Sequence, residues 1–136
     1  MTDFITVAVT RVIDAPAAKT WRATTEAPHF EQWFGAEPGT ARIDLRVDGT
    51  WSAIVEREGV EGELTGRYLE VVENHRVVMT VPNGPETLEV AFDVTDLGDG
   101  RSEATSSTRV AAEAKPVVEE TAGGILAEIA KIAEAL

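Results

Sequence analysis

The stretch from Val110 to Leu136 constrains the fold more than any other part of the chain. Its apolar residues recur at spacings of four and three, which places them on one side of a helix. This apolar stripe consists of Val118, Ala122, Ile125, Ile129, Ile132 and Leu136. Because most of the preceding sequence has the two-residue alternation of strands, we expect one sheet packed against one long C-terminal helix.

Length and composition indicate a single domain that spans residues 1–136. Of the 136 residues, 43% are hydrophobic, which is enough for a core of its own. The chain has no apolar run of the roughly 20 residues that a membrane span needs, and it begins without the pattern of a signal peptide. Since there is no cysteine, disulfides and thiolate metal sites are excluded. We expect a soluble cytoplasmic protein, either a monomer or a homodimer.

The charge of the chain is strongly acidic. Asp and Glu number 24 against 12 Lys and Arg, which gives a formal net charge of -12. Such a surface repels phosphate backbones and anionic lipid headgroups, so we expect neither nucleic acid nor a membrane as a partner. The acidic side chains are interpreted mainly as a solvated surface.

The N-terminal part of the sequence predicts one strand followed by two short helices. Alternating β-branched residues predict a strand over 4–13. A helix is expected over 16–25, with Pro16 in its first turn and Asp14 or Ala15 at the cap. A second helix begins at once with the same start signal, and three aromatic residues share one of its faces: Phe30, Trp33 and Phe34.

Six further strands joined mostly by short turns are expected to complete the sheet. The segments with strand character are 42–47, 51–55, 64–72, 77–81, 88–94 and 101–110. Asp48-Gly49 predicts a type I′ hairpin, Glu58-Gly59 a second turn, and 82–85 a further turn. We therefore expect an α+β fold in which the helices lie on one side of an antiparallel sheet.

The last predicted strand, about 101–110, is unusual because hydroxyl side chains occur on both of its faces. These residues are Ser102, Thr105, Ser106, Ser107 and Thr108. Two interpretations remain open. Either the strand carries a polar lining within the protein, or its inward face contacts water or a ligand.

Three parts of the chain resemble motifs of a known family. The segment from Arg11 to Gly35 resembles an "R-x-I-x-A-P…V-W…W-W-G" opening. Asp44–Trp51 resembles a "D-x-R-x-G-G-x-W" hairpin, and Gly66–Val71 with Arg76–Thr80 resembles a "G-x-y-x-e-I…R-L-V-x-T" strand pair. These are motifs of the Hsp90 ATPase activator homologue-like family, which the chain resembles over essentially its whole length.

The resemblance implies the helix-grip fold of the START/Bet v 1-like (SRPBCC) superfamily. In that fold a curved antiparallel sheet of seven strands surrounds a long C-terminal helix, and two short helices follow the first strand. It also implies a cavity between sheet and helix, which in many members holds an apolar ligand. Relatives include lipid and hormone carriers, polyketide cyclases and co-chaperones, so the resemblance does not imply one activity.

Three positions depart from the family's pattern. Thr121-Ala122 stands where relatives usually carry Gly-Trp, Thr80-Val81 where they often carry Thr-Trp, and Ser107 where they often place a His. Two bulky residues that could fill the cavity are therefore small. Gly123-Gly124 follows in the same helix, where each glycine costs roughly 1 kcal/mol relative to Ala. The glycine pair indicates close packing or a kink, or else room for a ligand below the helix.

We expect no catalytic residue, no metal site and no cofactor. The two histidines, His29 and His75, are most simply exposed surface residues, and cysteine ligands are lacking. The carboxylate pairs Glu61/Glu63 and Glu119/Glu120 are expected to be solvated rather than to divide acid and base roles.

The first functional hypothesis is a non-catalytic domain that binds a small apolar ligand between the sheet and the C-terminal helix. Hydroxyls of the last strand are expected to orient this ligand by hydrogen bonds. A chaperone-interacting module of the stress response is the alternative, and a cyclase- or dehydratase-type enzyme is the second alternative. The candidate cavity residues are Trp33, Trp51, Tyr68, Met79, Phe92, Ser106, Thr108, Ala122 and Leu126.

Overall fold

The computed structural model describes residues 3–136, and its strands form one antiparallel sheet in the order β1-β7-β6-β5-β4-β3-β2. The strands are β1 (Phe4–Ile13), β2 (Arg42–Ile43), β3 (Thr50–Arg57), β4 (Val60–Val72), β5 (Arg76–Asn83), β6 (Glu86–Asp96) and β7 (Ser102–Ala111). The helices are α1 (Ala17–Thr25), α2 (Ala27–Phe34), the 3-10 turn η1 (Ala112–Ala114) and α3 (Lys115–Ala135). The predicted α+β architecture of seven strands, two short helices and one long C-terminal helix is confirmed.

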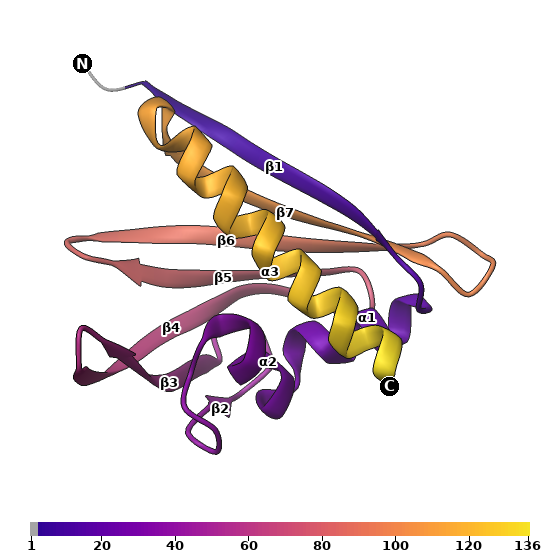
Figure 1. The fold of residues 1–136 in the computed structure, drawn as a ribbon, viewed down its shortest axis with the longest axis horizontal. Coiled ribbons are helices and arrows are strands. Elements are labelled where there is room, and N and C mark those ends of the chain that lie inside the picture. The colour runs from indigo at the N-terminus through magenta and orange to yellow at the C-terminus, as the bar shows by residue number, and fades with distance from the viewer. Residues whose placement is uncertain (1–2) are drawn as a thin grey trace.

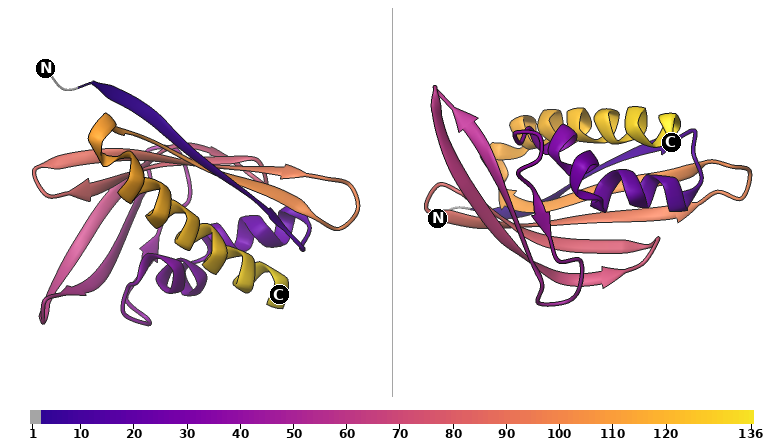
Figure 2. Two further views of the ribbon diagram at one scale, coloured as in Figure 1. Left: turned by 45° about the horizontal axis from the view of Figure 1, so that its top comes forward. Right: turned by 90° about the horizontal axis from the view of Figure 1, so that it is seen from below.

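All three α-helices lie on the concave face of the sheet. In Figure 1, α3 runs alongside β1 and passes diagonally across β7, β6 and β5, while α1 and α2 lie beside its C-terminal half. Figure 2 shows β3 and β4 bending away from the plane of β5 to β7, so the sheet curves around the helices. Although they are far apart in sequence, β1 and β7 lie side by side, with Phe4 opposite Ala111 and Ile13 opposite Ser102.

The C-terminal half of α3 is anchored in the core, whereas its N-terminal half is not. The side chains of Leu126, Ile129 and Ile132 are buried against α1, α2 and the sheet. Beyond them, the backbone N–H of Asp14 donates to Glu134 Oε2 over 3.0 Å, and Lys19 Nζ donates to the Leu136 carbonyl over 2.7 Å. Nearer the start of α3, the side chains of the predicted stripe are only partly covered, except at Ala122.

Trp51 is held in the core by a glycine on the neighbouring strand. Gly66 lies directly opposite Trp51, and a Cβ at Gly66 would collide with the indole ring and with the carbonyl oxygen of Thr80. The indole Nε1 donates to that same carbonyl over 3.0 Å. Glycine at this position therefore allows the ring to lie against the sheet, with its polar atom paired.

A buried carboxylate fixes the loop that follows α2. Glu31 accepts the backbone N–H of Gly39 on Oε1 over 3.0 Å and that of Ala41 on Oε2 over 2.8 Å. Because both carboxylate oxygens are occupied by backbone donors, the loop is tied to the helix that carries Trp33 and Phe34. Glu31 thereby helps to set the position of these two aromatic residues.

The predicted type I′ turn at Asp48-Gly49 is wrong, and the strand before it is shorter than expected. Only Asp48 has a positive φ, of 66°, and β2 ends at Ile43. A Cβ at Gly49 would collide with the carbonyl oxygen of Asp44, so Gly49 serves a close backbone approach. The hairpin with two left-handed residues is instead at Glu58 and Gly59, whose φ values are 54° and 79°.

Two prolines occupy positions other than those predicted. Pro16 is itself the N-cap of α1, with φ of -66° and ψ of 159°, so neither Asp14 nor Ala15 caps the helix. Pro82 belongs to β5 and pairs with Thr87. The turn between β5 and β6 therefore needs only two residues, because Gly84 adopts a φ of 61°.

Candidate functional site

A pocket of about 910 Å³ lies between the sheet and the N-terminal half of α3. Four side chains of α3 form its roof: Val118, Thr121, Ala122 and Ile125. The concave face of the sheet forms the floor, and the end of α2 forms the inner wall. The pocket lies where the apolar stripe of α3 leaves the packed core.

The floor of the pocket is built by two rows of residues that the strand register places side by side. Met79 of β5 lies opposite Val90 of β6, which lies opposite Thr108 of β7. In the next row, Phe92 lies opposite Ser106. The two hydroxyls therefore lie beside an otherwise apolar surface.

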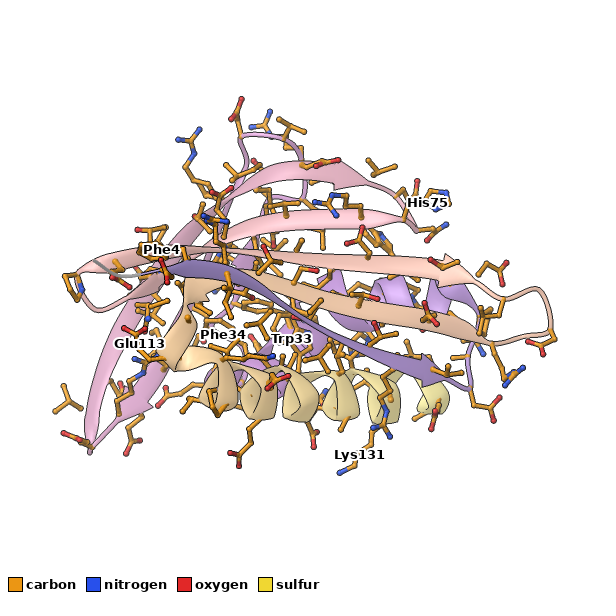
Figure 3. All side chains as sticks on the ribbon, turned by 90° about the horizontal axis from the view of Figure 1, so that it is seen from above. Phe4, Trp33, Phe34, His75, Glu113 and Lys131 are labelled. Carbon is orange, nitrogen blue, oxygen red and sulfur yellow. The ribbon has the colours of Figure 1, made fainter. Side chains whose placement is uncertain are left out.

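Aromatic rings close the inner end of the pocket. The Trp33 and Phe92 ring centroids are 5.3 Å apart in an edge-to-face arrangement, and Phe34 packs against Phe30 and Trp51 with centroids 4.7 and 5.1 Å away. Figure 3 shows Trp33 and Phe34 projecting into the space between α3 and the sheet. This cluster separates the pocket from the fully packed core.

The mouth of the pocket opens at the end of the molecule where β1 and α3 begin. Two large apolar side chains flank it in exposed positions, Phe4 at 52% exposed and Val117 at 68%. Four charged residues also border the pocket, and all four are exposed: Glu56, Arg57, Glu86 and Arg109. The lining is thus apolar inside and charged only at the rim.

The structure brings six of the nine candidate cavity residues together around this pocket. They are Trp33, Met79, Phe92, Ser106, Thr108 and Ala122. Val81, the other small residue that departs from the family's pattern, also lines it, whereas Ser107 faces away from it. Phe34, Val118 and Ile125 were not among the candidates, although the helical spacing of each was visible in the sequence.

Trp51, Tyr68 and Leu126 lie outside the pocket. The ring of Trp51 is held against Gly66, and Leu126 is fully buried on the far side of Ile125, where α3 meets the other helices. Tyr68 is buried on β4 next to a register shift, and this burial raises the pKa of its phenol.

Neither glycine of the Gly123-Gly124 pair borders the pocket. A Cβ added to either of them would meet no atom within 4 Å. The expectation of close packing is therefore wrong, and so is the expectation that these residues make room directly above a ligand. They weaken the helix without a contact that requires them.

The remaining titratable candidates do not converge on the pocket. His75 is exposed as predicted, but His29 is only 19% exposed and lies 3.4 Å from Glu26 Oε1, which corrects its expected position on the open surface. Glu61 is exposed, and its hydrogen bond to Glu37 raises the pKa of Glu37. Within residues 3–136, no three potential metal-ligating side chains are grouped together.

In the part of the chain that the structure describes, no helix is both long enough and apolar enough to span a membrane.

Comparison with known proteins identifies a family and a fold. Residues 14–136 match the family model described as Activator of Hsp90 ATPase homolog 1-like protein. No curated protein matches the sequence.

Similar solved structures cover nearly the whole chain at low sequence identity. A Staphylococcus aureus protein of unknown function is 14% identical, with a TM-score of 0.83 over 98% of this chain and 96% of that one. A Nitrosomonas europaea protein is 20% identical, with a TM-score of 0.77 over 96% and 95%. The Bet v 1 homologue Ara h 8.0201 is 14% identical, with a TM-score of 0.75 over 98% and 100%. The fold is therefore the Bet v 1-like helix-grip fold.

Proposed function

Since the chain belongs to the family of Activator of Hsp90 ATPase homolog 1-like proteins, we propose that it is a helix-grip domain that binds a small, largely apolar ligand under α3. The observation that carries this proposal is the pocket of about 910 Å³, with its apolar floor and aromatic inner wall. Pockets of this size and lining suit molecules of drug-like dimensions.

Two features of the pocket support ligand binding over a simple packing defect. Its roof is made by small or half-buried side chains, since Ala122 and Thr121 face it where a larger side chain would fill the space. Its mouth carries exposed Phe4 and Val117, which extend the apolar surface outward. A molecule that covers these groups removes apolar area from water, which is favourable by about 25 cal/mol per Å².

Fluorescence of N-phenyl-1-naphthylamine tests the proposal directly. This apolar dye brightens when it leaves water, so titration with the protein should give saturable binding with one site per chain. Native mass spectrometry of gently purified protein should also detect a retained small molecule. A protein that neither binds the dye nor retains any molecule would contradict the proposal.

A substitution in the roof locates the site. Ala122→Trp is expected to fill the pocket and to weaken dye binding at least tenfold, while the thermal unfolding transition remains cooperative. Val118→Trp serves the same purpose at a half-buried roof position, in case the first variant does not fold. Ala135→Trp, an exposed site on the same helix, is the matched control and should bind as the unaltered protein does. Unchanged binding by both roof variants would place the dye elsewhere.

A chaperone partner is the second candidate, and the description of the matched family favours it. The exposed large apolar side chains of the described residues are spread over separate elements, among them Val12 on β1, Leu69 on β4 and Leu97 in a turn. A protein-docking surface would be expected to gather such residues into one patch. Titration with purified Hsp90 from the same organism, read out as its ATPase rate, tests this role independently of the pocket.

A further inference from the structure

The buried serine and threonine side chains of residues 3–136 divide into two groups by their contacts. They are Thr20, Thr24, Thr25, Ser102, Ser106 and Thr108. The first four make hydrogen bonds of 2.7 to 2.8 Å within the protein. The side chains of Ser106 and Thr108 form no hydrogen bond to any other described residue.

The two hydroxyls without a protein partner are the two that face the pocket. Ser106 and Thr108 are two residues apart on β7, so both side chains point to the same face of the sheet. Both line the pocket floor beneath Ala122 and Ile125. Neither oxygen is among the fully buried polar atoms that lack a partner, so both hydroxyls reach the open space of the pocket, where they can bond to water or to a ligand.

The Trp33 side chain, which carries a third polar group, also lines the pocket. The indole Nε1 of Trp33 is buried and has no acceptor among the described residues, and the side chain is 7% exposed. The Trp33 ring packs against Phe92, and Phe92 lies directly opposite Ser106. The two hydroxyls and the Trp33 ring, which Figure 3 shows between α3 and the sheet, therefore belong to the same apolar pocket.

The charge distribution restricts what can bind at this polar spot. All four charged side chains that border the pocket are exposed at its rim. An ionised group on the floor would be buried without a partner of opposite charge, which is strongly unfavourable. A neutral carbonyl or hydroxyl group is satisfied there, because a hydroxyl side chain both donates and accepts hydrogen bonds.

We propose that the ligand is an uncharged, largely apolar molecule with one carbonyl or hydroxyl group that hydrogen bonds to Ser106 and Thr108 on the pocket floor. This inference rests on the proposed function and adds the chemical class of the ligand. The polar group lies deep in the pocket, and the apolar remainder extends along Met79 and Val90 toward the mouth.

Three naphthalene compounds of similar size test the proposal. They are 2-ethylnaphthalene, 2-acetylnaphthalene and 2-naphthoate, which carry a methylene, a neutral carbonyl and a carboxylate at the same place. Their affinities are measured by displacement of N-phenyl-1-naphthylamine. In the unaltered protein, the ketone should bind about fivefold or more tightly than the hydrocarbon, as one net hydrogen bond predicts. The carboxylate should bind more weakly than the ketone.

Substitutions on the two faces of β7 assign the effect to the hydroxyls. Ser106→Ala and Thr108→Val should each reduce the preference for ketone over hydrocarbon about fivefold, and they should leave binding of the hydrocarbon unchanged. Ser107→Ala removes the neighbouring hydroxyl on the other face and is the matched control, with the preference retained.

The outcomes separate this inference from the proposed function. If the dye and the hydrocarbon bind but the preference for the ketone is the same in Ser106→Ala, Thr108→Val and Ser107→Ala, the polar contact is refuted and the apolar pocket remains. If the carboxylate binds most tightly, the ligand is an anion held at the rim, which also overturns the inference. If no compound and no dye binds the unaltered protein, the proposed function itself fails.

Discussion

At the scale of single residues, identical hydroxyl groups on one strand have different roles. Ser102 Oγ donates to the Ala15 carbonyl over 2.8 Å and therefore accepts from Thr20 Oγ1, 2.7 Å away. These bonds join the start of β7 to the first half of α1 and the residue before it. Ser106, four residues further on, contacts the pocket instead. Both interpretations of the hydroxyl-rich strand thus apply, each to a different part of it.

Alanine substitution should separate these two hydroxyls by their effect on stability. Ser102→Ala leaves the Ala15 carbonyl and the Thr20 hydroxyl without partners, so we expect the free energy of unfolding to fall by about 1–3 kcal/mol. Ser106→Ala breaks no hydrogen bond within the protein and should change the free energy of unfolding by less than about 0.5 kcal/mol. Urea unfolding monitored by circular dichroism measures both values. Equal losses in the two variants would mean that Ser106 has a protein partner.

At the scale of elements, α3 behaves as two helices of different character joined end to end. The second half is buried along Leu126, Ile129 and Ile132 and bonded to the β1–α1 turn. The first half carries Gly123-Gly124, begins without a side-chain cap, and lies over the pocket. Low helix propensity and sparse packing therefore coincide in the half that roofs the pocket.

Replacing the glycines of α3 should stabilise the protein. Gly124→Ala adds a Cβ that meets no atom within 4 Å, and we expect about 1 kcal/mol of added stability from the lower backbone entropy of the unfolded chain. Gly123→Ala should raise the stability by a similar amount. Ala127→Gly on the same helix is the control and should have the opposite sign. Chemical denaturation gives all three values, and a loss of stability in both alanine variants would show that the glycines are required by a backbone contact.

At the scale of the whole molecule, the sheet, the helices and most of the pocket follow from periodicity. The spacing of Val118, Ala122 and Ile125 predicts the roof, and the alternation along β6 and β7 predicts which side chains face it. The periodicity of one strand does not predict which residue of the neighbouring strand lies opposite a given position. For this reason the sequence predicts Trp51 as a cavity residue, whereas in the structure its ring rests on Gly66.

The same limit explains the other differences between expectation and structure. Leu126 falls on the predicted stripe, but whether a position on that stripe meets a pocket or the core depends on where α1 and α2 pack. Turn chemistry is also ambiguous, because Asp48-Gly49 and Glu58-Gly59 both end in glycine. Only the close approach of Gly49 to the Asp44 carbonyl distinguishes them.

The folded molecule as a whole should resist ionisation of its single tyrosine. Burial raises the pKa of Tyr68 above its ordinary value of 10.0, so the native state retains the phenolic proton more tightly than the unfolded state does. The stabilisation is fully present below pH 10 and is lost as the pH rises toward the native-state pKa.

Alkaline titration checks this expectation. Because the chain contains one tyrosine, tyrosinate absorbance reports Tyr68 alone, and it should appear together with the loss of helical circular dichroism. Tyr68→Phe should remove the corresponding decline in the free energy of unfolding above pH 10, relative to the unaltered protein. Ionisation near the ordinary value in a fully folded protein would show that the phenol is accessible to solvent.

The position of β1 at the edge of the sheet has a consequence for how the protein is made. It is the first strand to leave the ribosome, yet its one neighbour in the sheet, β7, is the last. The register from Phe4 opposite Ala111 to Ile13 opposite Ser102 cannot form until synthesis has passed residue 111. The helices α1 and α2 must wait as well for α3, which covers them. The sheet is therefore expected to form late and slowly for a fold of this size, because its decisive contacts join distant parts of the sequence.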